Sequence, residues 1–174
     1  MTFLGPLART LAGAGLAFAV VGAAPAVAAP ADVALLQSYI GDWSGRGTVT
    51  GERSEAVVCR LKVSTGNSDK VNYSGRCTIA GKVLSINGTL AYVEAQRRFE
   101  AAMTSNAAFS GIAVGQQRGK GLLFNLRERD ADEAGKPYDI SADIALDQDA
   151  ISVGFSVVYV ETGDSIRASV PFSK

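Results

Sequence analysis

The fold of this chain is indicated most clearly by the segment VVCRLKVSTGNSDKVNYSGRCTI, residues 57–79. Two runs of alternating apolar and polar residues flank the turn-forming sequence TGNSD at 65–69, a pattern typical of a β-hairpin. If Cys59 and Cys77 face each other as antiparallel neighbours, one register satisfies both the alternation and the turn. The same register places two further pairs on the same face, Leu61 with Gly75 and Val63 with Tyr73.

Cys59 and Cys77 are the two cysteines of the chain, and the sequence predicts a structural disulfide between them. An even pair of cysteines in an oxidising compartment is most simply explained by such a bond. The alternative is a reactive or metal-binding thiol pair, but the chain has no C-x-x-C motif and no His for the usual mixed ligand sets. Closing this loop stabilises the fold by ~3 kcal/mol on the chain-entropy estimate.

The same alternation continues to the end of the chain and predicts an all-β domain. Turn-forming sequences at 87–88, 147–149 and 162–164 separate the runs, as in a series of tight hairpins. Eight to ten antiparallel strands in this order favour a closed barrel or a sandwich. The alternating apolar positions are Phe99, Ala101, Met103, Leu122, Phe124, Leu126, Tyr138, Ile140, Ala142, Ile144, Leu146, Ile151, Val153, Phe155, Val157, Tyr159, Ile166, Ala168, Val170 and Phe172.

The opposite face of these strands is polar, which bears on a membrane-embedded alternative. A transmembrane barrel presents an apolar band with aromatic girdles to the lipid. Here the outward positions are polar, so we keep an outer-membrane-associated barrel as a less favoured alternative. Examples of these positions are Arg60, Lys62, Asn72, Ser74, Arg76, Asp139, Ser141, Asp143, Ser165, Arg167 and Ser169.

Residues 1–28 predict a cleaved signal peptide. Arg9 supplies a basic start, an apolar run follows at 11–21, and Ala26-Val27-Ala28 forms an A-x-A cleavage site. The apolar run is too short to anchor the chain as a transmembrane helix. We therefore expect a periplasmic or secreted protein, with residues 29–174 forming a single β-barrel domain.

Composition excludes several classes of function. The removal of Arg9 with the signal peptide leaves 16 basic and 17 acidic residues, and this balance does not favour nucleic acid as a partner. Without His there is no Ser-His-Asp or Cys-His arrangement, and no G-x-S-x-G or phosphate-binding glycine motif occurs. We therefore expect no enzymatic activity, no cofactor and no metal site.

Carboxylates are densest between residues 130 and 139. Because Gly135 and Pro137 accompany them, this segment is interpreted as a solvated loop between strands. The alternative is a calcium loop, but Asp130 and Asp132 do not complete the Asp-x-Asp-x-Asp-Gly pattern.

Gly41-Asp42-Trp43 follows a short helix predicted from Asp32 through Ile40, which could plug one end of a barrel. Here the chain resembles the calycins, the group that holds lipocalins and avidins, and it looks like a small secreted bacterial barrel of that type. The resemblance implies that Trp43 closes one barrel end, with an Arg of the last strand packed across it. Arg167 lies in that region, although the alternation points it outward unless a bulge intervenes.

The interior of such a barrel suggests a binding function. Small residues interspersed with aromatic ones can leave a lined cavity, or can simply fill a tapering core. The favoured hypothesis is a non-catalytic module that binds a small apolar or amphipathic ligand. The alternative is a protein-interaction module, such as a bacterial protease inhibitor acting through residues 29–40. The candidate ligand-binding residues are Trp43, Tyr73, Phe124 and Tyr159.

Overall fold

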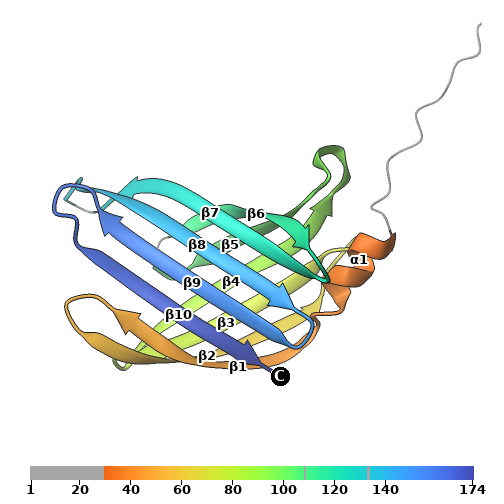
Figure 1. Ribbon diagram of the computed structural model, residues 1–174, viewed down its shortest axis with the longest axis horizontal. Helices are drawn as coiled ribbons and strands as arrows, with labels where there is room; N and C mark the ends of the chain where they lie inside the picture. Colours follow the sequence, from red (N-terminus) through yellow and green to blue (C-terminus); the bar gives the residue numbers. More distant parts are fainter. Residues whose placement is uncertain (1–29, 108, 133) are drawn as a thin grey trace, which may run out of the picture.

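The computed structural model describes residues 30–107, 109–132 and 134–174, so the predicted signal peptide at 1–28 lies outside the described residues. In the described part, ten antiparallel strands form one closed barrel, and a short helix covers one end (Figure 1). The elements are α1 Pro30–Gln37, β1 Gly41–Thr50, β2 Ser54–Thr65, β3 Val71–Ile79, β4 Lys82–Val93, the 3-10 helix η1 Glu94–Gln96, β5 Arg98–Ser105, β6 Ser110–Arg118, β7 Gly121–Ala131, β8 Pro137–Asp147, β9 Ala150–Tyr159 and β10 Ser165–Ser173.

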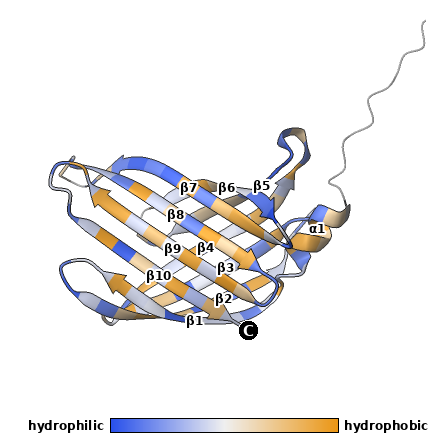
Figure 2. Ribbon diagram, in the orientation of Figure 1, coloured by the Kyte–Doolittle hydropathy of each residue, from blue (hydrophilic) through white to orange (hydrophobic). Residues whose placement is uncertain are grey.

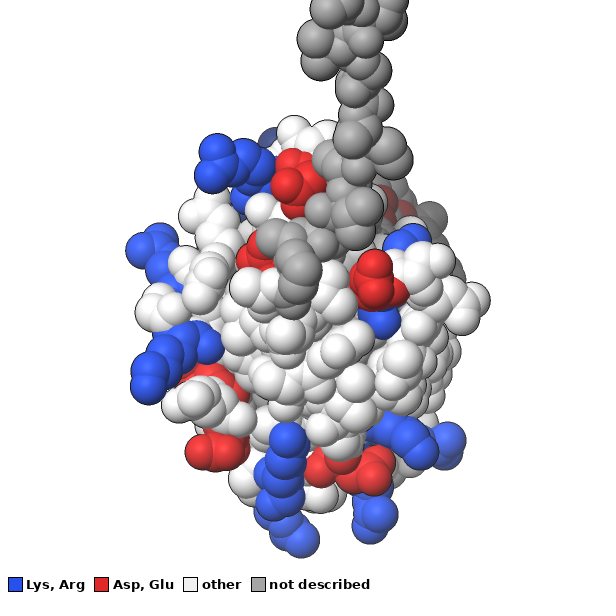
Figure 3. All heavy atoms as spheres, turned by 90° about the vertical axis from the view of Figure 1, so that its right-hand side faces the viewer, with Lys and Arg blue, Asp and Glu red and all other residues white. Residues whose placement is uncertain are grey.

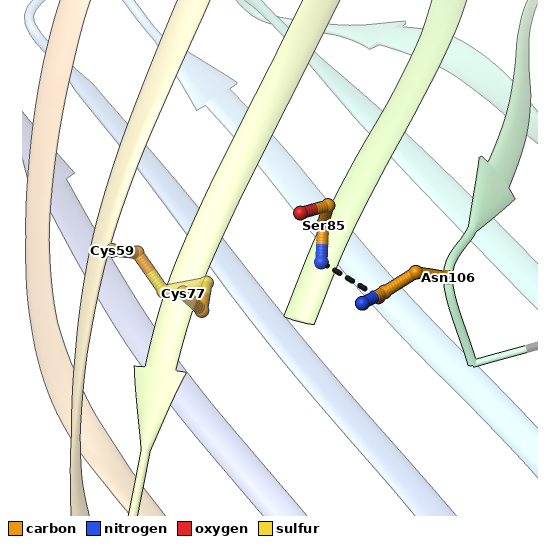
Figure 4. Close-up of a disulfide and its surroundings, with 4 residues drawn as sticks. All are labelled: Cys59, Cys77, Ser85 and Asn106. Atoms are coloured by element: carbon orange, nitrogen blue, oxygen red, sulfur yellow. Dashed lines mark hydrogen bonds between the residues drawn. A yellow bond between two sulfur atoms is a disulfide. The ribbon is translucent and has the colours of Figure 1, made fainter. Parts of the chain in front are cut away.

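The hairpin formed by β2 and β3 has the register predicted from the sequence. Cys59 lies directly opposite Cys77, and the two are joined by a disulfide (Figure 4). Leu61 pairs with Gly75 and Val63 with Tyr73. Cys59 is buried and Cys77 half-buried, so the disulfide lies on the inner face of the barrel wall.

Alternation of side chains separates the core from the surface on most strands. On β8, Ile140 and Ala142 are buried in the core, whereas Asp139 and Asp143, which flank them, are exposed. Figure 2 shows the resulting bands of hydrophobic and hydrophilic residues along the strands. Because closure pairs each strand on both sides, the barrel avoids long exposed sheet edges.

The helix begins earlier and ends earlier than predicted. It runs from Pro30 to Gln37, with Asp32 inside the first turn instead of at the cap, because proline is well suited to the first helical position. The chain then turns through Tyr39 and Ile40, whose backbone N–H groups donate to Leu36 and Gln37. Within the described residues, no helix is long and apolar enough to cross a membrane.

The predicted loop at 130–139 is shorter in the structure and is confined to the connection between Ala131 and Pro137. β7 continues to Ala131 and β8 begins at Pro137, so Asp130 and Asp139 are strand residues. The outward charges pair across the two strands, Arg129 with Asp139 and Arg127 with Asp143. Sequence spacing alone does not reveal these cross-strand ion pairs.

The ladder between β6 and β7 is among the shortest in the barrel, with five partner pairs, as many as the interrupted ladder between β1 and β10. β6 pairs with β7 over Val114–Arg118 and Gly121–Asn125, whereas β7 pairs with β8 along almost its whole length. In the described part of the chain, the first residues of β6 and the last residues of β7 therefore separate toward the end opposite α1. Phe109 and Leu126 fill this space, since both lie within 3.2 Å of where a Cβ on Gly111 would stand.

We expect Gly47→Ala to destabilise the protein by about 1–3 kcal/mol or more, because overpacking forces a backbone shift. A Cβ at Gly47 would collide with the carbonyl oxygen of Ser169 on the adjacent strand β10. The matched control is Gly154→Ala, where the nearest atom is the carbonyl oxygen of Asp143 at 3.7 Å. Urea unfolding of both variants checks this, and an equal loss in the two would contradict it.

Reduction of the Cys59–Cys77 disulfide is expected to lower the midpoint of thermal unfolding by several degrees, because it releases a loop with a sequence separation of 18. Calorimetry with and without reductant measures the change, with a Cys59→Ser/Cys77→Ser variant as the reductant-insensitive control. Alkylation of both thiols in the native, unreduced protein would show that the bond does not form.

Candidate functional site

One end of the barrel is closed by hydrogen bonds from two aromatic side chains. The indole Nε1 of Trp43 donates to the carbonyl oxygen of Tyr39 at 3.0 Å, and the Tyr39 hydroxyl donates to the carbonyl oxygen of Leu146 at 2.9 Å. Burial, together with the negative charge of Asp147, raises the pKa of Tyr39, so its hydroxyl remains a donor at neutral pH. With Leu36 at 0% and Trp43 at 1% exposure, this end is tightly packed.

Lys174, and not Arg167, provides the cation over Trp43. The Lys174 ammonium lies 4.9 Å from the Trp43 ring centroid, within the range of a cation–π interaction. Arg167 is exposed and points outward from β10, as the alternation indicated. Figure 3, which looks onto the closed end, shows basic side chains interspersed with acidic ones around an uncharged centre.

Tyr73 and Phe124 belong to the packed wall of the barrel. The Tyr73 hydroxyl donates to the carbonyl oxygen of Ala102 at 3.1 Å, and its ring occupies the space that a Cβ on Gly88 would need. Burial raises the pKa of Tyr73, which keeps this donor protonated. Phe124 is fully buried, with its ring against Gly115 on β6. The glycines opposite these rings let the strands pack closely.

The other end of the barrel, which we call the mouth, is formed by the turns that follow β1, β3, β5, β7 and β9 (Figure 1). Along β10 the inner face becomes steadily more exposed toward this end, from 6% at Val170 to 42% at Ile166. Other inner-face residues near the mouth are also partly exposed. We call them, with Ile166, the mouth cluster: Met103, Phe109, Tyr138, Phe155, Val157 and Tyr159.

Tyr138 and Tyr159 form the most specific contact at the mouth. They are directly opposite on β8 and β9, and their rings meet edge to face with centroids 5.9 Å apart. Burial raises the pKa of Tyr138, and the charge of Asp130, the neighbouring Tyr159 and the charge of Asp132 raise it further, in that order. The mouth therefore combines aromatic surface with nearby carboxylates.

Two shallow hollows lie on the outside of the barrel. The first, of about 330 Å³, crosses β8, β9, β10 and β1 and is lined mainly by hydroxyl side chains around Gly154, with Arg167 and Asp143 beside them. The second, of about 580 Å³, crosses β4, β5 and β6 and includes Ile112, which is 53% exposed. Among the described residues, no group of three or more potential ligand side chains is placed to hold a metal ion.

The four predicted ligand-binding residues do not share one site. Trp43 belongs to the closed end, Tyr73 and Phe124 to the packed wall, and Tyr159 to the mouth. Sequence reasoning did not single out Tyr138 as a site residue, although its place opposite Tyr159 follows from the hairpin turn at 147–149. Aromatic residues at inner positions look alike in sequence, whatever their depth in the barrel.

Comparison with known proteins supports the fold. Neither a protein-family model nor a curated protein matches the chain. The crystal structure of Rv2717c from M. tuberculosis matches with a TM-score of 0.66 at 17% identity, covering 84% of this chain and 98% of that one. The S-type phycobiliprotein lyase CPES from Guillardia theta matches with a TM-score of 0.54 at 8% identity, covering 81% of this chain and 90% of that one.

Both structures are lipocalin-like barrels, so the calycin-like fold expected from Gly41-Asp42-Trp43 is confirmed. At these identities the likeness establishes the fold alone. In the part of the chain that the structure describes, ten strands close a barrel of calycin-like fold with one packed end and a partly apolar mouth.

We expect Lys174→Ala to lower the free energy of unfolding by about 0.5–1 kcal/mol, because it removes the cation over Trp43. Arg167→Ala is the matched control and should stay within about 0.5 kcal/mol, as is usual for exposed side chains away from such contacts. Chemical denaturation followed by Trp43 fluorescence measures both variants. A larger loss for Arg167→Ala would reverse this assignment.

Proposed function

We propose that this protein is a non-catalytic binding barrel that holds a small apolar or amphipathic molecule at its mouth. The observation that carries the proposal is the one-sided exposure of the inner face. Trp43 and Leu36 are sealed at one end, whereas Ile166 and the rest of the mouth cluster are left partly exposed at the other. Exposed aromatic and aliphatic side chains that converge at a barrel mouth are suited to an apolar ligand.

We also propose that the protein works in the periplasm or outside the cell. The Cys59–Cys77 disulfide supports an oxidising compartment. The sequence pattern of residues 1–28 supports the same location, because it has the parts of a signal peptide.

A protease inhibitor acting through residues 29–40 has weaker support. Leu36 and Tyr39 are buried against the barrel, and Tyr39 is hydrogen-bonded to the carbonyl oxygen of Leu146. This segment therefore has a structural role that competes with use as a free recognition segment.

Binding can be tested with the neutral apolar dye N-phenyl-1-naphthylamine, whose fluorescence rises in apolar surroundings. We expect saturable binding by the purified protein, weakened at least about tenfold by Ile166→Glu, which puts a charge on the apolar inner face at the mouth. The matched control is Ile112→Glu, because Ile112 is similarly exposed but faces outward from β6. Circular dichroism checks that both variants are folded.

The two variants also separate the competing sites. Loss of dye binding in Ile112→Glu but not in Ile166→Glu would assign binding to the outer hollow across β4, β5 and β6. An absence of saturable binding in the unaltered protein would overturn the proposed function.

A further inference from the structure

The inner face of β7 changes character beyond Leu126. Leu122, Phe124 and Leu126 are buried in the core, and the same alternation then continues with Glu128 and Asp130. Residues directly opposite in an antiparallel pair share a face. Glu128 lies opposite the core residue Ile140, and Asp130 lies opposite Tyr138. Two carboxylates therefore follow the inner face of the barrel out to the mouth.

The neighbouring arginines are engaged elsewhere. Arg129 donates two hydrogen bonds to the Asp139 carboxylate, at 2.7 and 3.0 Å, and Arg127 donates to Asp143 at 2.9 Å. Both of these pairs lie on the outer face of β7 and β8. The guanidinium groups that alternate with Glu128 and Asp130 along β7 are thus directed away from them.

Among the described residues, the turn between β7 and β8 adds Asp132 and Lys136 to this side of the mouth, and the turn between β9 and β10 adds Glu161 and Asp164, so carboxylates outnumber the lysine there. Glu55 lies opposite Val49 on the inner face of β1 and β2, and Lys82 follows the inner alternation of β4. Lys82 is separated from β7 by β5 and β6 in the barrel order. On the β7–β8–β9 side, carboxylates and the Tyr138–Tyr159 pair occupy the same part of the mouth.

Aromatic rings beside carboxylates form a good environment for an organic cation. The face of a Tyr ring attracts an ammonium group, and a nearby carboxylate adds Coulomb attraction. The partly exposed Phe155 and Val157, further along β9, continue the same inner surface with apolar side chains. The arrangement places an acidic, aromatic site for the charged head group of an amphiphile beside an apolar surface for its hydrocarbon chain.

From this geometry we infer that the preferred ligands of the mouth are cationic amphiphiles. Their amine or quaternary ammonium head would lie by Glu128, Asp130, Tyr138 and Tyr159, and their apolar chain would lie over Phe155 and Val157. This inference rests on the proposed function, because it names the class of molecule that the same mouth binds.

Calorimetric titration with three decyl amphiphiles, each kept below its critical micelle concentration, tests the inference. The probes are decyltrimethylammonium, decyl maltoside and decyl sulfate, which share a chain and differ in head charge. We expect the cation to bind at least about tenfold more tightly than the neutral probe, and the anion to bind most weakly. Added salt should reduce the difference, because the head interaction is electrostatic.

Two variants with the same change of net charge locate the effect. Glu128→Gln/Asp130→Asn should remove most of the preference for the cation while leaving decyl maltoside binding within about twofold. Asp147→Asn/Asp149→Asn, which alters the β8–β9 turn at the closed end, should retain the preference. An equal loss in both variants would indicate a general charge effect and overturn the inference.

The failures of the two proposals are distinguishable. Equal binding of all three probes would overturn the inference and leave the proposed function standing. If none of the three binds, the proposed function fails together with it.

Discussion

The hydrogen bonds that join Trp43 to Tyr39, and Tyr39 to Leu146, determine which end of this barrel is closed. They link the segment after α1 both to the start of β1 and to the end of β8. Tyr39 and Leu146 are 107 residues apart in the chain. Each donor is buried, so its loss would leave a polar group without a partner in the core. At this end the aromatic side chains are buried and their polar groups are hydrogen-bonded. The partial exposure of the inner face therefore lies toward the mouth, and a ligand would have to bind there.

Much of the fold follows from the sequence because period-2 alternation is a local signal. It correctly predicted the register of Cys59 with Cys77 and the outward direction of Arg167. The place of Trp43 at a barrel end was implied instead by the resemblance to the calycins. The charged segment at 130–139 was only partly a loop, because its two ends belong to β7 and β8 and carry charged residues that pair across the strands. Such pairs, like Arg129 with Asp139, join residues ten positions apart through a turn, and composition alone does not distinguish them from a solvated loop.

The candidate site was less predictable than the fold. Alternation tells which side chains face inward but not how far along the barrel axis each one lies. Phe124 and Tyr159 both occupy inner positions, yet one is packed against Gly115 and the other meets Tyr138 at the mouth. Depth depends on the stagger between strands and on which end the helix covers. Both are properties of the closed barrel as a whole.

The short ladder between β6 and β7 has a consequence for how the barrel moves. Because this ladder has few partner pairs while the other β7 ladder, to β8, is nearly complete, a local opening of the wall can begin where β6 and β7 have already separated beside Phe109. Such sub-global openings expose backbone amides without unfolding the whole domain. We therefore expect amide hydrogens near this seam to exchange with solvent earlier than those of β8 and β9. Local opening between β6 and β7 can widen the mouth on that side, while the Cys59–Cys77 disulfide keeps β2 and β3 joined.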